Sequence, residues 1–139
     1  MQIKKLSLVV GKENSLNVRK NLCLQKKRGV RCTIFSFTEV DEKLGKIVSY
    51  KLDEDELRKI WSPKIIMVVD QSHTLMGSAQ SVEQSKAILT QNKAISEIAM
   101  NHIILDITLA GQRLGFDSTE YVKDIMRNPA EDLQSLLRT

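Results

Sequence analysis

The chain has 139 residues, of which 42% are apolar, 27% are charged and 4% are aromatic, and its formal net charge is +4. This composition is typical of one water-soluble domain with an aliphatic core, and it excludes a disordered or fibrous chain. We find no run of about 18 uncharged apolar residues and no signal-peptide pattern, so we expect a cytoplasmic protein without a transmembrane span. Cys23 and Cys32 are expected to be free thiols, with a cross-strand disulfide as the alternative.

The positive charge is concentrated at the start of the chain. Residues 1–32 contain nine basic residues and one acidic residue, a local charge of +8, so the rest of the chain carries −4. This asymmetry predicts a basic face that contacts phosphate groups, and the alternative is a solvated surface with no partner. The candidate phosphate contacts are Lys12, Arg19, Lys20, Lys26, Lys27, Arg28 and Arg31.

The first half of the chain shows the patterns of β-strands. We expect strands at residues 3–10, 30–40 and 46–52, because these segments are rich in apolar and β-branched residues and are bounded by turn signals. Residues 16–25 alternate like a strand but also fit a helix, which would give a ferredoxin-like order instead. Because the connections are short, we expect antiparallel pairing.

A short helix and a buried strand follow. Asp53 and Glu56 form a capping box, which predicts a helix that ends before Ser62 and Pro63. Residues 64–70 contain an unbroken apolar run bounded by Pro63 and a polar loop, as in a strand buried on both faces.

A long helix is expected next. Between Gly77 and Gly111 the sequence contains no glycine or proline, and apolar residues recur at helical spacing. One such helix would be about 50 Å long, which exceeds a compact domain of this size. We therefore expect either a break near Gln91 and Asn92 or an overhang covered by a second subunit. The stripe expected in that oligomer interface consists of Ile95, Ile98, His102, Leu105 and Leu109.

Two further helices are expected at the end of the chain. Capping signals begin at Asp117 and again at Asn128. The expected fold is therefore a single α+β domain over residues 1–139. Its antiparallel sheet and short helix lie in a basic first half, residues 1–70, and the long helix and two shorter helices form a helical half, residues 71–139, that mediates oligomerisation.

The first half also resembles a known family. The order of basic strands, acidic turn, strand and capped helix over residues 15–62 resembles the single-stranded DNA-binding unit of the positive-cofactor-four and whirly group. The resemblance implies a curved antiparallel sheet that holds unpaired strands on its exposed face and a dimer formed through helices. It departs from the family at Phe35 and Phe37 and after Pro63.

The same function can be argued from physical requirements. Single-stranded nucleic acid is held by cations along its phosphates and by aromatic rings on which bases stack. Phe35 and Phe37 share one face of their predicted strand, so both are candidate stacking residues if that face is wet. If that face is buried, they are core residues, which is the commoner outcome for Phe.

The sequence contains no phosphate-binding glycine loop, nucleophile elbow or metal-ligand spacing, so we expect no catalytic residue, no metal and no cofactor. The run from Ile65 to Leu89 resembles the metal-binding loop of von Willebrand factor A-type domains, with Asp70, Ser72 and Thr74 at the ligand spacing. Too few strands follow for that fold, and a strand ending in a turn explains the same residues. An enzyme centred on Asp70, Ser72 and His73 is a third interpretation.

The favoured hypothesis is a non-enzymatic protein that binds nucleic acid, single-stranded DNA in particular, through its basic sheet and forms a homodimer through its helices. The alternative is a protein-interaction or assembly subunit that oligomerises through its helices and has no nucleic-acid role.

Overall fold

A computed structural model of the chain describes residues 5–9, 27–40, 42–62, 64–78 and 86–126. Its elements are, in chain order, β1 (Lys5–Val9), β2 (Arg31–Thr38), η1 (Glu42–Leu44), β3 (Lys46–Leu52), α2 (Glu54–Arg58), β4 (Lys64–Val69), β5 (His73–Ser78), β6 (Lys86–Thr90), α3 (Lys93–Leu114) and α4 (Thr119–Val122). The chain has an α+β fold, as its sequence predicts.

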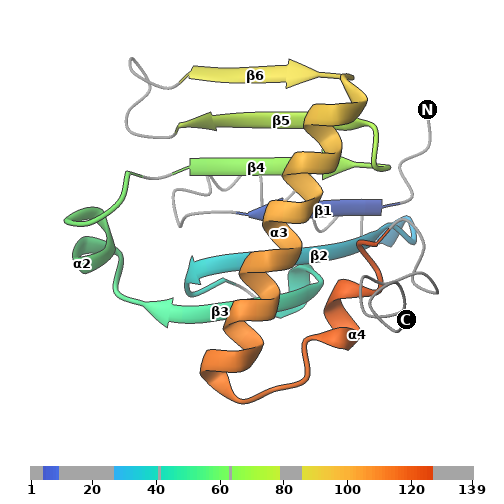
Figure 1. The fold of residues 1–139 in the computed structure, drawn as a ribbon. Coiled ribbons are helices and arrows are strands. Elements are labelled where there is room, and N and C mark those ends of the chain that lie inside the picture. Colours follow the sequence, from blue (N-terminus) through green and yellow to red (C-terminus); the bar gives the residue numbers. More distant parts are fainter. Residues whose placement is uncertain (1–4, 10–26, 41, 63, 79–85, 127–139) are drawn as a thin grey trace, which may run out of the picture.

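The strands form one six-stranded mixed sheet in the order β3-β2-β1-β4-β5-β6. Three neighbouring strands, β1, β2 and β3, run parallel to one another. The other three continue the sheet from β1 in antiparallel pairs. Helix α3 runs obliquely across one face of this sheet (Figure 1).

The main core lies between the sheet and α3. Phe35, Val48 and Val68 point from the strands into this layer and meet Ile103 and Ile107 of the helix. Alternate residues of β2 point to opposite faces, and Ile34 contributes instead to a second buried cluster, which consists of Val30, Cys32, Ile34 and Val40. Cys32 of this cluster is buried. Strand β2 is therefore covered on both faces.

The expected antiparallel pairing of residues 31–38 with 46–52 is wrong, because β2 and β3 are parallel. Residues 39–45 connect the end of β2 to the start of β3, which lies beside the first residues of β2. Val40 in this connection is buried in the cluster with Val30 and Ile34. Packing of the connection against one face of β2 therefore replaces the hairpin turn that its short length suggests.

The expectation of a helical second half is also wrong in part, because β5 and β6 lie within residues 71–90. Of the two expectations for the long helix, the break near Gln91 and Asn92 is confirmed. Asn92 is the N-cap of α3, and its side chain accepts a hydrogen bond from the backbone N–H of Ile95. The apolar triplet in β6 has no periodicity that separates strand from helix, so pairing with β5 decides its conformation.

The remaining predicted elements agree to different degrees. The N-cap half of the expected capping box of α2 forms, with the Asp53 carboxylate accepting from the N–H of Glu56 at 3.0 Å, while the Glu56 carboxylate pairs with Lys59. The helix expected after Asp117 is confined to α4 and the turn that follows it. The alternatives for residues 16–25 and the last expected helix lie outside the described residues.

Candidate functional surfaces

Helix α3 presents two apolar faces. Its inner face is buried against the sheet through residues such as Ala99, Ile103 and Ile107. Its outer face exposes Ile98 and Leu105, which are each 67% exposed. An isolated surface helix normally carries polar residues on that side. The packing of the domain therefore explains the apolar residues on the inner face of α3, but not those on its outer face.

The outer face contains the stripe expected from the sequence. Ile98, His102, Leu105 and Leu109 follow one another at intervals of four, three and four residues, the spacing of a helix seam. All four are exposed, and Ile95 is half-buried at the beginning of the stripe. We refer to these five residues as the α3 seam.

The α3 seam contains few charges. His102 lies 3.3 Å from Asp106 on the next turn of the helix. Burial raises the pKa of Asp106, and attraction to His102 opposes part of that shift. Besides His102, the ionisable side chains of α3 are Lys93, Glu97, Asp106 and Arg113.

Among the described residues, α3 is also the one helix long and apolar enough to cross a membrane. Length and composition are weak evidence for such a span, because the core helix of a soluble domain has the same properties. In α3, 39% of the relevant window is buried within the domain. The inner face of α3 is thus packed against the sheet, whereas the apolar side chains of the α3 seam have no such contact within the described residues.

Three of the predicted phosphate contacts lie at one corner of the molecule. Lys27 and Arg28 precede β2, Arg31 is its first residue, and all three are exposed. We refer to them as the basic corner. Lys12, Arg19, Lys20 and Lys26 lie outside the described residues.

The basic corner is not free of acidic neighbours. The carboxylate of Asp124 lies 2.6 Å from the ammonium group of Lys46 on the adjacent strand. The hydrogen bond from Lys46, followed by the charges of Lys46 and Arg31, lowers the pKa of Asp124. Asp124 therefore offsets part of the positive potential at this corner.

The two predicted stacking residues both face α3. Phe35 is buried and belongs to the main core. Phe37 is half-buried and stacks against Tyr50, with ring centroids 5.9 Å apart, while Trp61 meets its edge. Trp61 is 53% exposed, so this aromatic cluster is partly wet.

The aromatic cluster and the basic corner lie at opposite ends of β2. Phe37 lies six positions after Arg31, a distance of about 20 Å along a strand. The structure thus does not bring the described cations together with the aromatic rings. A single nucleotide could not contact both groups at once.

A cavity of about 280 Å³ lies between the β4–β5 turn and the start of α3. Its lining residues are Asp70, Gln71, Ser72, Gln91, Lys93, Glu97 and Met100. Asp70 and Gln71 both have left-handed backbone conformations, with φ of 50° and 60°, and the N–H of Ser72 bonds to the carbonyl of Val69. These values describe a type I′ hairpin turn.

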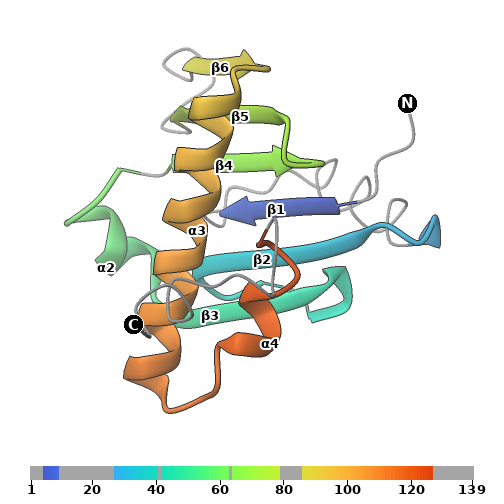
Figure 2. The same ribbon diagram turned by 45° about the vertical axis from the view of Figure 1, so that its right-hand side comes forward.

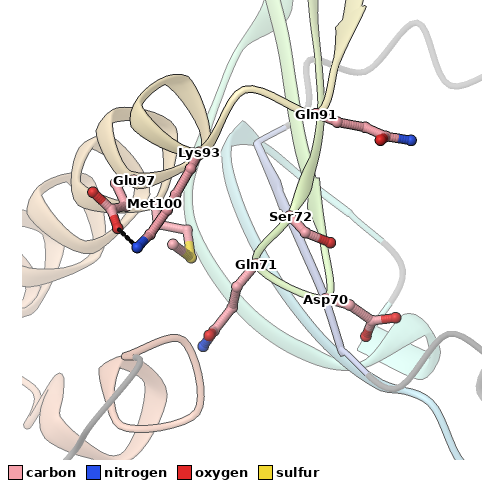
Figure 3. A pocket seen from close by; sticks show the side chains of 7 residues that line it. All are labelled: Asp70, Gln71, Ser72, Gln91, Lys93, Glu97 and Met100. Carbon is pink, nitrogen blue, oxygen red and sulfur yellow. Dashed lines mark ion pairs between the residues drawn. The ribbon is translucent and has the colours of Figure 1, made fainter.

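The polar groups around this cavity do not converge on one point. In Figure 3, Asp70, Ser72 and Gln91 point away from α3, and the amide of Gln71 donates a hydrogen bond to the carbonyl of Ile125, 3.3 Å away. Lys93 lies 3.9 Å from Glu97 on the helix.

The histidine of the proposed enzyme site is engaged at both ring nitrogens. Nδ1 of His73 lies 2.9 Å from the Ser72 hydroxyl, and Nε2 lies 3.0 Å from the Gln91 amide. Thr74, the third residue of the metal-loop pattern, is buried and hydrogen-bonds to Ser96. In the part of the chain that the structure describes, no group of three His, Cys, Asp or Glu residues could hold a metal ion.

The sequence interpretation missed two exposed apolar features. One is the pair Ile60 and Trp61 after α2, and the other is the pair Ile88 and Leu89 in β6. The second pair was hidden because residues 86–90 were expected to be helical. A five-residue strand of this composition carries no sequence signal that would have separated it from a helix.

Comparison with known proteins adds no further assignment. No family model matches the chain, and no curated protein matches it.

Proposed function

We propose that this protein is a non-enzymatic assembly subunit that self-associates through the α3 seam. The observation that carries the proposal is the seam itself, in which Ile98, Leu105 and Leu109 remain exposed at the spacing of a helix interface. A second copy supplies the same surface, so a two-fold axis pairs the seam with itself. The pairing buries side chains that the domain leaves in water.

The size of the effect makes each seam residue important. Burying a Leu or Ile side chain contributes about 1.5–3 kcal/mol when it starts fully exposed. Association costs about 4–15 kcal/mol in lost freedom of motion. Three apolar side chains from each of two copies offset a cost of this size, and the loss of one from each copy strongly weakens the pair.

The test is the mass of the protein in solution, measured by sedimentation across a range of concentrations. We expect the wild type to self-associate. We expect the variants Ile98→Glu and Leu105→Glu to have half the wild-type mass, because the pair formed through the α3 seam is lost. The matched control is Ile60→Glu, since Ile60 is 74% exposed and lies outside α3. A wild-type monomer at high concentration, or equal masses for all four proteins, would reject the proposal.

Nucleic-acid binding is the second candidate function, and the basic corner is the observation in its favour. Because the aromatic cluster lies at the other end of β2, contacts at this corner are made to phosphates rather than to stacked bases. Binding through three phosphate contacts has a salt slope of about −2.7, so a rise from 50 to 200 mM salt weakens it about 40-fold.

This second candidate is tested by titrating labelled oligonucleotides, single- and double-stranded, at both salt concentrations. The variant Lys27→Glu/Arg28→Glu/Arg31→Glu is expected to lose binding. The control carries the same charge change on other elements, at Lys64, Lys93 and Arg113, which are exposed. Equal binding by the two triple variants would remove the basic corner from the function.

A further inference from the structure

The two edges of the sheet differ in how far they are protected. At the β3 edge, the end of α3 and the turn that follows it extend beyond the strand in both views (Figures 1 and 2). Lys46 of β3 is bound to Asp124 and to the carbonyl of Glu120. Lys51 has a left-handed φ of 52°, which bends the end of the strand. These features hinder the addition of another strand at this edge.

The edge at β6 carries no such protection in the described part of the chain. Among the described strands, β6 is last in the sheet and only β5 pairs with it. Its residues 86–89 are all exposed, and Lys86 is the only charged residue among its five. Ile88 is 66% exposed and Leu89 is 72% exposed, and as neighbours in a strand they point to opposite faces. Natural proteins rarely leave such an edge open.

We infer that β6 pairs in antiparallel fashion with β6 of a second copy of this chain, about a two-fold axis at Ile88. The partner must present a strand with apolar side chains on both faces, because Ile88 and Leu89 occupy both. Strand β6 meets this requirement itself. In the register centred on Ile88, Leu89 lies opposite Ala87 of the other copy.

The position of the charged residue and the backbone hydrogen bonding both agree with this register. Lys86 lies opposite Thr90 of the other copy, so the single charge of the strand does not face a like charge. Each backbone group at the open edge also finds its partner, because the two identical strands exchange N–H and C=O groups symmetrically. The pairing therefore extends one six-stranded sheet into the next.

The β6 surface is separate from the α3 seam. The seam lies on the exposed side of α3, which covers one face of the sheet, whereas β6 is an edge strand of that sheet (Figures 1 and 2). One neighbouring copy cannot cover both, so a chain that uses both surfaces assembles into at least four copies. This stoichiometry depends on the proposed function, but the pairing of β6 does not.

Cysteine cross-linking tests the register directly. In a Cys23→Ser background, Ile88→Cys places the new thiol directly opposite the same thiol of the second molecule, where a disulfide can form. The matched variant Thr90→Cys places the two thiols about 14 Å apart, too far to bridge. We expect rapid covalent dimers from Ile88→Cys alone. Equal cross-linking of the two variants, or none from either, would overturn the inference.

Solution mass separates this inference from the proposed function. Ile88→Lys and Leu105→Glu are each expected to halve the wild-type mass, and the combined variant is expected to be a monomer. If Leu105→Glu has no effect but Ile88→Lys lowers the mass, the α3 seam is wrong and the β6 pair stands. A monomeric Leu105→Glu protein whose Ile88→Cys derivative does not cross-link would show that β6 serves a different partner, and it would reject the inference.

Discussion

Thr74 and Ser96 share a hydrogen bond of 2.8 Å between their hydroxyl groups, which joins β5 to α3 in the interior. Both side chains are completely inaccessible to solvent. Ser96→Ala leaves the Thr74 hydroxyl without this partner, so we expect it to lower the free energy of unfolding by about 1–3 kcal/mol. In the double variant Thr74→Val/Ser96→Ala, both polar groups are removed, and most of that loss should be recovered. Urea denaturation measures both changes, and two losses that simply add would contradict this explanation.

Gly45 approaches β2 more closely than a side chain permits. A Cβ atom at this position would lie 2.6 Å from the carbonyl oxygen of Cys32. We expect Gly45→Ala to destabilise the protein by about 1–3 kcal/mol, because the backbone of β2 must move. Gly29→Ala is the comparison, since Gly29 has a φ of 78° and an open surrounding. Its backbone strain alone costs about 1–2 kcal/mol. Thermal unfolding should therefore show the larger loss for Gly45→Ala, and the reverse order would contradict the close approach.

The N-cap of α3 gives a prediction whose sign depends on where the helix begins. Asn92→Ala removes the bond to the N–H of Ile95, so we expect a loss of about 1 kcal/mol in the free energy of unfolding. If the helix instead began before Asn92, this position would be internal, and alanine would stabilise it. Asp53→Ala, at the N-cap of α2, is the control for a cap on a short helix. Chemical denaturation of the two variants distinguishes the two outcomes.

Asp106 predicts a dependence of stability on pH. Burial raises the pKa of its carboxyl group above the ordinary 3.8 in the folded state. A raised acid pKa means that the folded state binds the proton more tightly, so stability falls as pH rises through this range. We expect Asp106→Asn to be more stable than the wild type at neutral pH and to lose this advantage below the ordinary pKa. Unfolding curves between pH 3 and 7 test this, and a wild type favoured at neutral pH would contradict it.

The local patterns predicted more of the fold than the long-range pairings. The β-branched and aromatic run of β2 and the capping box of α2 are set by neighbouring residues, and both were predicted with nearly correct bounds. The parallel pairing of β2 with β3 is accompanied by burial of Val40 of the connection against β2, and no local pattern records such a contact. Strand β6 was missed for a similar reason, because pairing with β5 overrides its ambiguous local preference.

The candidate surfaces were predicted unequally as well. Helical periodicity alone placed Ile98 and Leu105 on one stripe of α3, and the structure leaves both of these side chains exposed. The distance between the aromatic cluster and the basic corner could not be derived in this way. This distance follows from the length of β2 and from the end of the strand that each group occupies. The sequence pattern predicted one common face for the cations and the aromatic rings.

The unequal edges of the sheet limit how far it can grow. A sheet with two open edges can add further molecules without end, as happens in fibrils. Here the end of α3 extends past the β3 edge and Lys46 of that strand is bound to Asp124, so we expect two molecules paired through β6 to add a third less readily at β3. If β6 pairs as inferred, growth in the plane of the sheet is expected to stop at two molecules. Such an asymmetry would let the fold keep an apolar strand at its edge without becoming a seed for aggregation.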